Sequence, residues 1–122
     1  MRAIIAGGRN FDNYALLEKE CYAILCNYGD KSDIEIVSGC ANGADKLGER
    51  FANDFVLKVI KFPADWDTYG KSAGYKRNEQ MAIYAKEQDG VLVAFWDGKS
   101  KGTKHMIDLA RKHKLTVHII NY

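Results

Sequence analysis

Five short apolar runs, rich in β-branched residues, alternate along this chain with segments of helical periodicity. Several runs are apolar without interruption, which is typical of strands buried on both faces of a parallel sheet. The run 91–95 is the most apolar, so we expect its strand inside the sheet. Strict alternation predicts an α/β fold with helices on both faces and right-handed crossovers. The five predicted strands are Arg2–Ala6, Ile34–Val37, Leu57–Phe62, Gly90–Trp96 and Leu115–Ile120.

Four helices are predicted between these runs. Apolar residues recur three or four positions apart from Tyr14 to Tyr28, with Gly29 as the expected C-cap, and again over 44–55. The third helix is expected over about 75–88. The fourth begins near Thr103 and ends in a basic cluster at 111–114, which complements the helix dipole. With 122 residues, 47% of them hydrophobic, and no linker or repeat, the chain 1–122 is predicted to be one domain.

Composition restricts the class of protein. No run of 18 apolar residues is present, so we predict no membrane helix and no membrane partner, and a strand that starts at Arg2 leaves no room for a secretory signal. Cys21, Cys26 and Cys40 lack metal-ligand spacing, so they are predicted to be reduced thiols in a cytoplasmic protein without a metal site. Residues 1–54 hold nine acids and six bases (−3), and residues 55–122 hold seven and twelve (+5), which permits an anionic ligand.

Four loops follow the first four predicted strands, at 7–13, 38–44, 63–74 and 97–102, and all contain glycine. Ligands of such sheets bind outside the carboxyl ends of the strands. Glycine lets the backbone approach a ligand, and the N–H groups that open the next helix favour phosphate or carboxylate. Neither the dinucleotide fingerprint nor the P-loop pattern is present.

Several side chains near these loops are suited to a nucleotide. Trp66 and Tyr69 lie in the long third loop, where they are expected either to stack on a base or to pack as a lid. Arg77 is expected in the first turn of the third helix, where a base opposes the dipole unless an anion binds. Asp97 ends the fourth strand within reach of a ribose hydroxyl, whereas Asp45 is expected to cap the second helix.

The loops together resemble one known family. The motifs are Gly7-Gly8-Arg9-x-Phe11, Ser38-Gly39-x-Ala41-x-Gly43-Ala44-Asp45, Phe62-Pro63-Ala64-Asp65-Trp66, Arg77-Asn78-x-x-Met81 and Ala94-Phe95-Trp96-Asp97-Gly98-x-Ser100-x-Gly102-Thr103. They resemble the SLOG superfamily, and more closely its small YspA-related branch. The resemblance implies a single three-layer Rossmann-like domain whose five-stranded sheet has the order 3-2-1-4-5.

The resemblance also implies a ligand that is a nucleotide or derives from one. Relatives include the LOG phosphoribohydrolases, which cleave cytokinin nucleotides, the DprA proteins, which bind single-stranded DNA, and nucleotide sensors in conflict systems of bacteria and phages. LOG enzymes use a Gly-Thr-x-x-Glu run with a catalytic glutamate. Here Gly102-Thr103 is followed by Met106 at that position. A thioether cannot act as a base, so LOG-type hydrolysis is disfavoured, and Met106 is expected in the core.

Three functions remain open from the sequence. The first is a sensor or binding module for a nucleotide, with no cofactor required. The second is an N-glycosidase acting on a nucleoside monophosphate through Asp97 and Arg77. The third is a DprA-like binder of single-stranded nucleic acid. A homo-oligomer is compatible with the exposed sheet edges.

The backbone N–H groups of Gly7-Gly8, Gly43-Ala44 and Gly102-Thr103 are expected to hold phosphate, and Arg9, Arg77 and Lys104 to add charge. The predicted ligand-binding residues are Gly7, Gly8, Arg9, Ser38, Gly39, Gly43, Ala44, Asp45, Trp66, Arg77, Asn78, Trp96, Asp97, Gly98, Ser100, Gly102, Thr103 and Lys104.

Overall fold

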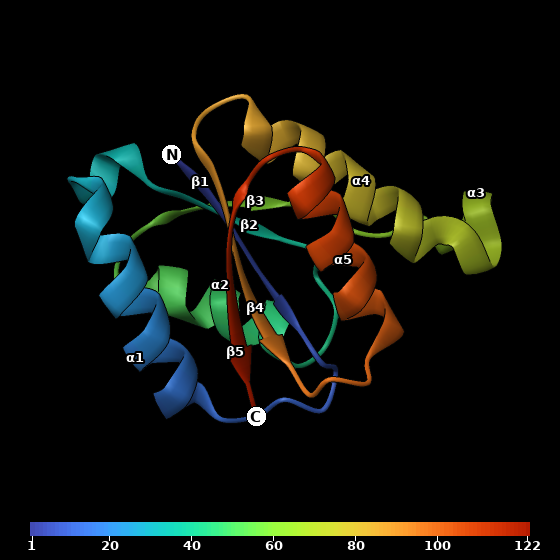
Figure 1. Cartoon of the computed structure of the whole chain (residues 1–122), viewed down its shortest axis with the longest axis horizontal. Coiled ribbons are helices and arrows are strands. Elements are labelled where there is room, and N and C mark those ends of the chain that lie inside the picture. The colour runs from blue at the N-terminus through green and yellow to red at the C-terminus, as the bar shows by residue number, and fades with distance from the viewer.

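A parallel sheet of five strands runs through the molecule in the order β3-β2-β1-β4-β5 (Figure 1). The computed structural model describes all residues from Met1 to Tyr122. The predicted fold class and strand order are therefore confirmed. The strands are β1 (Arg2–Gly7), β2 (Glu35–Ser38), β3 (Lys58–Lys61), β4 (Gly90–Trp96) and β5 (Thr116–Asn121).

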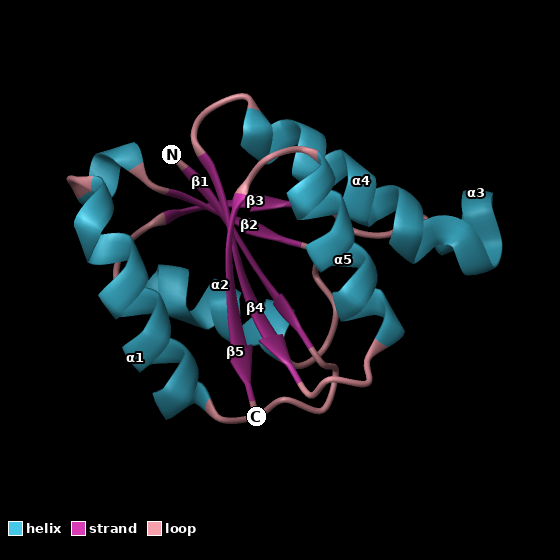
Figure 2. Ribbon diagram, viewed as in Figure 1, coloured by secondary structure: helices cyan, strands magenta, loops and turns pink.

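Helices cover both faces of the sheet, as Figure 2 shows. On one face, α1 and α2 close over a cluster of 14 buried residues that includes Ile5, Phe51 and Phe95. On the other face, α4 and α5 close over a second cluster of 13, which includes Met81 and Met106. The helices are α1 (Tyr14–Leu25), α2 (Ala44–Asp54), α3 (Trp66–Tyr69), α4 (Ala73–Lys86) and α5 (Lys101–Lys112), with short 3₁₀ turns at Cys26–Tyr28, Lys31–Asp33 and Gly70–Ser72.

The most apolar strand, β4, lies inside the sheet, between the central strand β1 and the edge strand β5. In this position its residues from Val91 to Phe95 are buried. Strand β3 is shorter than predicted. Val56 has a positive φ of 56°, so the chain turns just before the strand, and Pro63 has no N–H to extend a ladder beyond it.

Two local predictions for the third loop and its helix are wrong. Trp66–Tyr69 forms the one-turn helix α3, because the Asp65 side chain accepts the Thr68 N–H at 3.1 Å and caps it. Helix α4 begins at Ala73, two residues earlier than expected, so Arg77 lies in its second turn rather than its first. The position of Arg77 therefore has to be explained by its contacts rather than by the helix dipole.

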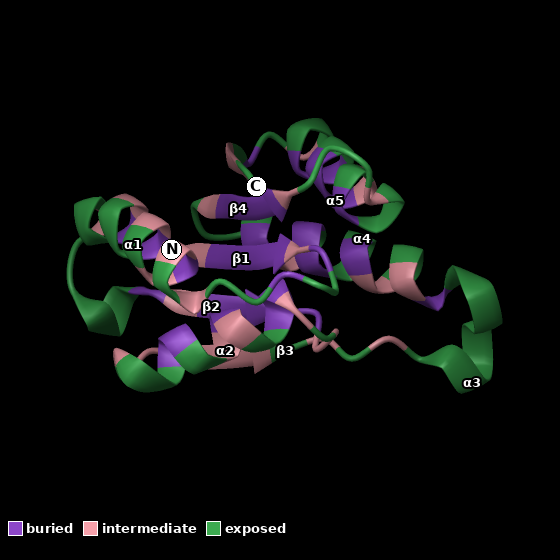
Figure 3. Ribbon diagram, turned by 90° about the horizontal axis from the view of Figure 1, so that it is seen from below, coloured by how far each residue is buried: buried purple, intermediate pink, exposed green.

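The strands β1, β2 and β4 end at one edge of the sheet, and the segment that carries α3 extends outward from that edge (Figure 3). Two glycines allow the loops there to approach one another. A Cβ on Gly7 would lie 2.4 Å from the Phe95 carbonyl oxygen, and one on Gly43, which has φ +81°, would lie 2.2 Å from the Gly8 carbonyl oxygen. A side chain at either position would force the loops apart.

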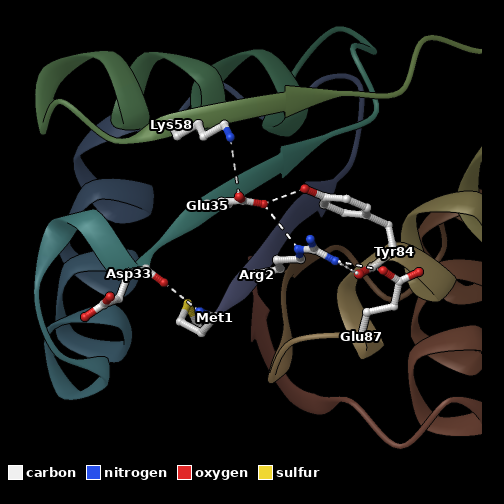
Figure 4. A network of polar contacts seen from close by, with 7 residues as sticks. All are labelled: Met1, Arg2, Asp33, Glu35, Lys58, Tyr84 and Glu87. Carbon is white, nitrogen blue, oxygen red and sulfur yellow. Dashed lines mark hydrogen bonds and ion pairs between the residues drawn. The ribbon is translucent and has the colours of Figure 1, made fainter.

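A polar network ties the opposite edge together (Figure 4). The Arg2 guanidinium donates to Glu35 at 3.2 Å and to the Tyr84 carbonyl oxygen at 2.7 Å, and it lies 3.6 Å from the Tyr84 ring centre. The Tyr84 hydroxyl donates to Glu35 at 2.5 Å. These contacts join β1, β2 and the end of α4 far from the predicted ligand edge. No helix in the chain is long and apolar enough to span a bilayer.

Candidate functional site

A cavity of about 470 Å³ opens at the carboxyl ends of β1 and β4. Its walls come from the loops after β1, β2 and β4, the segment between β3 and α4, helices α2, α4 and α5, and the residue that follows β5. Parallel strands bring these distant segments to one edge. The lining residues are Ala6, Gly7, Gly8, Arg9, Asn10, Ala41, Asp45, Trp66, Lys71, Gly74, Tyr75, Arg77, Asn78, Met81, Asp97, Ser100, Gly102, Thr103, Met106 and Tyr122.

Arg77 projects from α4 across the cavity toward the loop after β2. Its Nη1 donates to the Gly39 carbonyl oxygen at 2.5 Å, and its Nε donates to the Asn78 side-chain oxygen at 3.0 Å. No group in the chain accepts a hydrogen bond from Nη2. Burial lowers the pKa of Arg77, while Asp45 acts against that shift. The guanidinium is thus fixed in place, charged, and left with hydrogen-bonding capacity for a ligand.

Asn78 connects Arg77 to the start of α5. The side chain is only 6% exposed. Its Nδ2 donates to the Gly102 carbonyl oxygen at 3.4 Å and lies 3.2 Å from Nδ1 of His105. Because its oxygen already accepts from Arg77, the amide is fully engaged within the protein. Asn78 lines the cavity, but its geometry makes it a residue that positions Arg77.

Asp45 is a buried carboxyl group beside Arg77 and is 6% exposed. The prediction that it caps α2 is wrong: its Oδ2 accepts the Ala41 N–H at 3.1 Å, outside the helix, and Gly43 is the N-cap. Burial raises the pKa of Asp45 to about 6, although the Ala41 N–H and Arg77 oppose the rise. A Cβ on Gly39 would lie 2.8 Å from that same oxygen. Glycine at 39 therefore lets the loop close over Asp45 and Arg77.

Two of the backbone N–H groups predicted to hold phosphate are already paired with backbone oxygens. The Gly8 N–H donates to the Phe95 carbonyl oxygen and the Ala44 N–H to the Gly8 carbonyl oxygen, both at 3.2 Å. The Thr103 N–H donates to Ser100 Oγ at 3.3 Å. The first two bonds hold neighbouring loops against one another, and the third is the N-cap of α5. None of these three N–H groups is free to donate to a phosphate.

Other backbone donors at the same edge remain free. The N–H groups of Arg9 and Asn10 have no acceptor in the chain, and the same holds for Gly102 in the first turn of α5. All three residues line the cavity. Unpaired N–H groups at a loop and a helix start attract an anion. The cavity therefore keeps anion donors: Gly102 is one of the predicted positions, and Arg9 and Asn10 lie one and two residues beyond the predicted Gly8.

The loop after β4 is ordered by Asp97 and Ser100. One oxygen of Asp97 accepts the N–H groups of Lys99 and Ser100, each at 2.8 Å, and these bonds lower the pKa of the exposed carboxyl group. Ser100 caps α5, and its hydroxyl lies 3.0 Å from the Thr103 hydroxyl. Asp97 is consequently an ionised group, which suits it to accept a hydrogen bond rather than to deliver a proton.

Three aromatic side chains stand around the cavity mouth. Trp66, Tyr75 and Tyr122 are 50%, 48% and 48% exposed. Tyr75 packs edge-on against His105 with the ring centres 4.5 Å apart. Tyr122 contacts Phe11 at 4.7 Å, and its hydroxyl covers Gly8 so closely that a Cβ there would meet it at 2.2 Å. Flat apolar rings at the rim of a polar cavity suit a purine or pyrimidine.

Several predicted ligand residues lie outside this cavity for identifiable reasons. Ser38 is buried, and its hydroxyl donates to Glu49 at 2.6 Å while it accepts the Cys40 N–H at 3.1 Å, so it stabilises its own loop. The Trp96 indole donates to the Ser100 carbonyl oxygen at 3.1 Å. Lys104 pairs with Asp108 at 3.0 Å. The lining also lacks Tyr69 of the long loop and four predicted loop residues: Gly39, Gly43, Ala44 and Gly98.

Sequence reasoning missed several lining residues. Tyr122 follows the fifth strand, so the rule that the ends of parallel strands meet at one edge applies to it as well, but the glycine signal was confined to the first four loops. Met81 and Met106 are buried and form apolar parts of the wall, as the core prediction for Met106 allows. For Asn10 and Lys71, the sequence carried no sign of a binding role other than their position in the predicted loops.

No group of three or more His, Cys, Asp or Glu side chains is placed to hold a metal ion. The three cysteines are free.

The first half of the chain decides its family. The model of YAcAr, the YspA, cpYpsA-related SLOG family, matches residues 1–69, from β1 through α3. The chain belongs to this SLOG family. The matched segment contains the loops after β1 and β2, with Arg9, Gly39 and Asp45, so the family match covers one side of the cavity.

Two similar proteins extend the comparison. The Gene 61 protein of Mycobacterium phage D29 is 34% identical over 87 residues, which are 67% of this chain and 67% of that protein. The crystal structure of DNA processing protein A (DprA) from Streptococcus pneumoniae superposes with a TM-score of 0.73 over 99% of this chain, at 17% identity. This SLOG chain spans 50% of the DprA chain. At that identity the likeness shows a shared fold.

Proposed function

We propose that this SLOG protein binds a nucleotide or a nucleotide-derived ligand in the cavity at the carboxyl edge of its sheet, as a sensor or binding module. Family membership and the DprA-like fold support nucleotide or nucleic-acid binding in general terms. One observation favours a ligand that carries a phosphate. The fixed, half-buried Arg77 guanidinium keeps Nη2 free in the same cavity as the unpaired N–H groups of Arg9, Asn10 and Gly102.

The ligand's parts match the parts of the cavity. A phosphate takes the free N–H groups and the guanidinium, which together supply charge and directed donors. The ribose lies within reach of the ionised Asp97 carboxylate and the Ser100 hydroxyl. The base stacks at the mouth against Trp66, Tyr75 or Tyr122. A cavity of about 470 Å³ has the size of a small-molecule site.

We do not extend the proposal to hydrolysis. Met106 is 1% exposed and brings no carboxylate to the cavity. Asp97, the other candidate for that chemistry, stays ionised and is held by two loop N–H groups. Neither group can protonate a leaving base. A DprA-like role in binding single strands would instead appear as oligonucleotide binding in a ligand screen.

The test is a thermal-shift screen followed by calorimetry. The panel contains nucleoside mono- and diphosphates, NAD, cyclic dinucleotides, inorganic phosphate and a single-stranded oligonucleotide. A ligand at 100 times its Kd adds about 2.7 kcal/mol to the free energy of unfolding, which gives a clear rise in Tm. Arg77→Ala should abolish the rise, and Arg77→Lys should weaken it because the forked donor is lost.

Arg111→Ala is the matched control, since it removes an exposed arginine from α5 outside the cavity. The proposal predicts that this variant binds like the wild type. A flat response to every nucleotide would contradict the proposal. Binding of the oligonucleotide alone, with a steep salt dependence, would replace it by single-strand binding.

A further inference from the structure

A second hollow of about 340 Å³ adjoins the cavity on the side of the loop after β2. It is lined by the loop that contains Gly39, Cys40 and Asn42, and by Pro63 and Ala64 ahead of α3. Apart from the residues that it shares with the cavity, this hollow takes no part in the site described above. None of the proposed sugar or base contacts except Trp66 borders it.

The two hollows meet along a shared boundary. Arg9, Ala41, Trp66 and Arg77 line both of them. Two cationic side chains and one indole therefore stand where the hollows join. The guanidinium groups are near enough for Arg9 to oppose protonation of Arg77, and the buried Asp45 carboxyl group lies beside them. Two neighbouring guanidinium groups attract an anion to the boundary itself.

The loop backbone is shaped to keep this boundary open. A Cβ on Gly39 would lie 3.0 Å from Cδ and 3.1 Å from Nε of Arg77, so a larger residue would push the arginine out of place. The Cys40 and Ala41 N–H groups are held by Ser38 and Asp45. The Asn42 side chain makes no hydrogen bond within the protein and is exposed at the rim of the second hollow.

We infer that the second hollow is a subsite for a group attached to the far side of the phosphate, and that the ligand is a nucleotide extended through a pyrophosphate or phosphodiester. The nucleoside occupies the larger cavity, the charged linkage lies between Arg9 and Arg77, and a polar group such as a second sugar occupies the smaller hollow near Asn42. A simple monophosphate leaves that hollow to water. This inference rests on the proposed function, since it places the same phosphate.

The experiment compares matched ligands by calorimetry: AMP, ADP and ADP-ribose, and the corresponding series UMP, UDP and UDP-glucose. The diphosphate separates the effect of added charge from that of the added group. We expect the extended member of the preferred series to bind at least tenfold more tightly than its diphosphate. Equal affinity of ADP and ADP-ribose, and of UDP and UDP-glucose, would overturn the inference while leaving the proposed function intact.

Variants locate the gain in the second hollow. Ala64→Trp fills that hollow and should remove the tenfold gain while the monophosphate binds within twofold of the wild type. Ala64→Leu fills less of the hollow and should remove part of the tenfold gain. This variant keeps the test valid if Ala64→Trp fails to fold. Ala23→Trp, at an exposed position on α1, is the matched control and should keep the full gain. A gain that survives Ala64→Trp would overturn the subsite, and a failure of every nucleotide to bind would overturn the proposed function together with it.

Discussion

The Arg77 guanidinium donates to the side-chain oxygen of its own neighbour, Asn78, at 3.0 Å, and Asn78 in turn donates to the Gly102 carbonyl oxygen of α5. This chain of contacts links the cationic group of the cavity to the helix whose first turn carries a free N–H. Arg77 and Gly102, the two ends of this chain of contacts, are both lining residues of the cavity. The buried Asn78 amide therefore acts as a positioning group: it holds Arg77 and the start of α5 in one geometry.

Asn78→Ala should weaken nucleotide binding about tenfold, because Arg77 loses one of its two anchors, and hydrogen bonds to charged groups contribute about 1.5–3 kcal/mol. Calorimetry on the wild type, Asn78→Ala, Arg77→Lys and the double variant measures this loss, because Arg77→Lys keeps a measurable affinity. If Asn78 acts through Arg77, the double variant binds no worse than Arg77→Lys alone. Additive losses would contradict the link. Gln80→Ala, at an exposed position on α4, is the control and should bind normally.

Gly7→Ala should destabilise the fold severely, whereas Gly102→Ala should not. The new methyl at 7 would lie 2.4 Å from the Phe95 carbonyl oxygen, while nothing lies within 4 Å of a Cβ at 102. The expected loss for Gly7→Ala is about 3 kcal/mol, from overpacking between two central strands. Gly102→Ala should gain up to about 1 kcal/mol from helix propensity. Urea unfolding of both variants tests this, and equal stabilities would contradict the packing described here.

The pH dependence of stability should contain a contribution from Asp45. Its pKa in the folded protein is about 6, above its usual range, because the group is buried. The folded state therefore holds this proton more tightly than the unfolded chain, and the free energy of unfolding falls as pH rises from about 4 to about 6. Asp45→Asn lacks this fall, so between pH 4.5 and 7.5 the variant should gain about 2 kcal/mol relative to the wild type.

Urea unfolding at both pH values measures the Asp45 contribution. Asp67→Asn is the control because this carboxyl group is exposed on α3, and its profile should follow that of the wild type. Parallel profiles for the wild type and Asp45→Asn would show that the Asp45 pKa is not raised on folding.

Tyr84→Phe should lower stability without touching the ligand site. The lost hydroxyl donates to the Glu35 carboxylate at 2.5 Å in the network of Figure 4, at the edge of the sheet opposite the cavity. We expect a loss of about 1–2 kcal/mol in urea unfolding, and nucleotide affinity within twofold of the wild type. Tyr22→Phe removes an exposed hydroxyl without a hydrogen bond and should change neither quantity. Reduced affinity in Tyr84→Phe would mean that the two edges are coupled.

The sequence predicted the sheet well because the signals for it are local. Short, uninterrupted apolar runs such as Val91–Phe95, bounded by turns, favour buried strands, and their alternation with helical segments predicts a parallel arrangement. The strand order came from the family resemblance. The start of α4 was misplaced because Gly74 disfavours a helix interior, although Ala73 before it favours one. The helix at Trp66–Tyr69 was missed because its cap depends on one side chain, Asp65.

The site was less predictable because it depends on how the loops meet. That the loops converge follows from the parallel sheet, so Arg9, Arg77 and Asp97 could be placed at one edge from sequence. That the Gly8 and Ala44 N–H groups are already paired depends on a close approach of two loops that is visible only in three dimensions. The inward orientation of Ser38 toward Glu49 is likewise a tertiary contact. Ligand binding by these residues stays a prediction.

The most direct test of nucleotide binding at this edge is a titration of the ¹⁵N-labelled protein with the best-binding nucleotide, followed by amide chemical shifts. We predict that the Arg9, Asn10 and Gly102 amides shift with saturating, concordant curves, because their N–H groups are free to receive the phosphate. The Gly29 and Gly90 amides should stay in place, since they lie away from the cavity. Saturating shifts at other amides, with Arg9, Asn10 and Gly102 unmoved, would contradict the account.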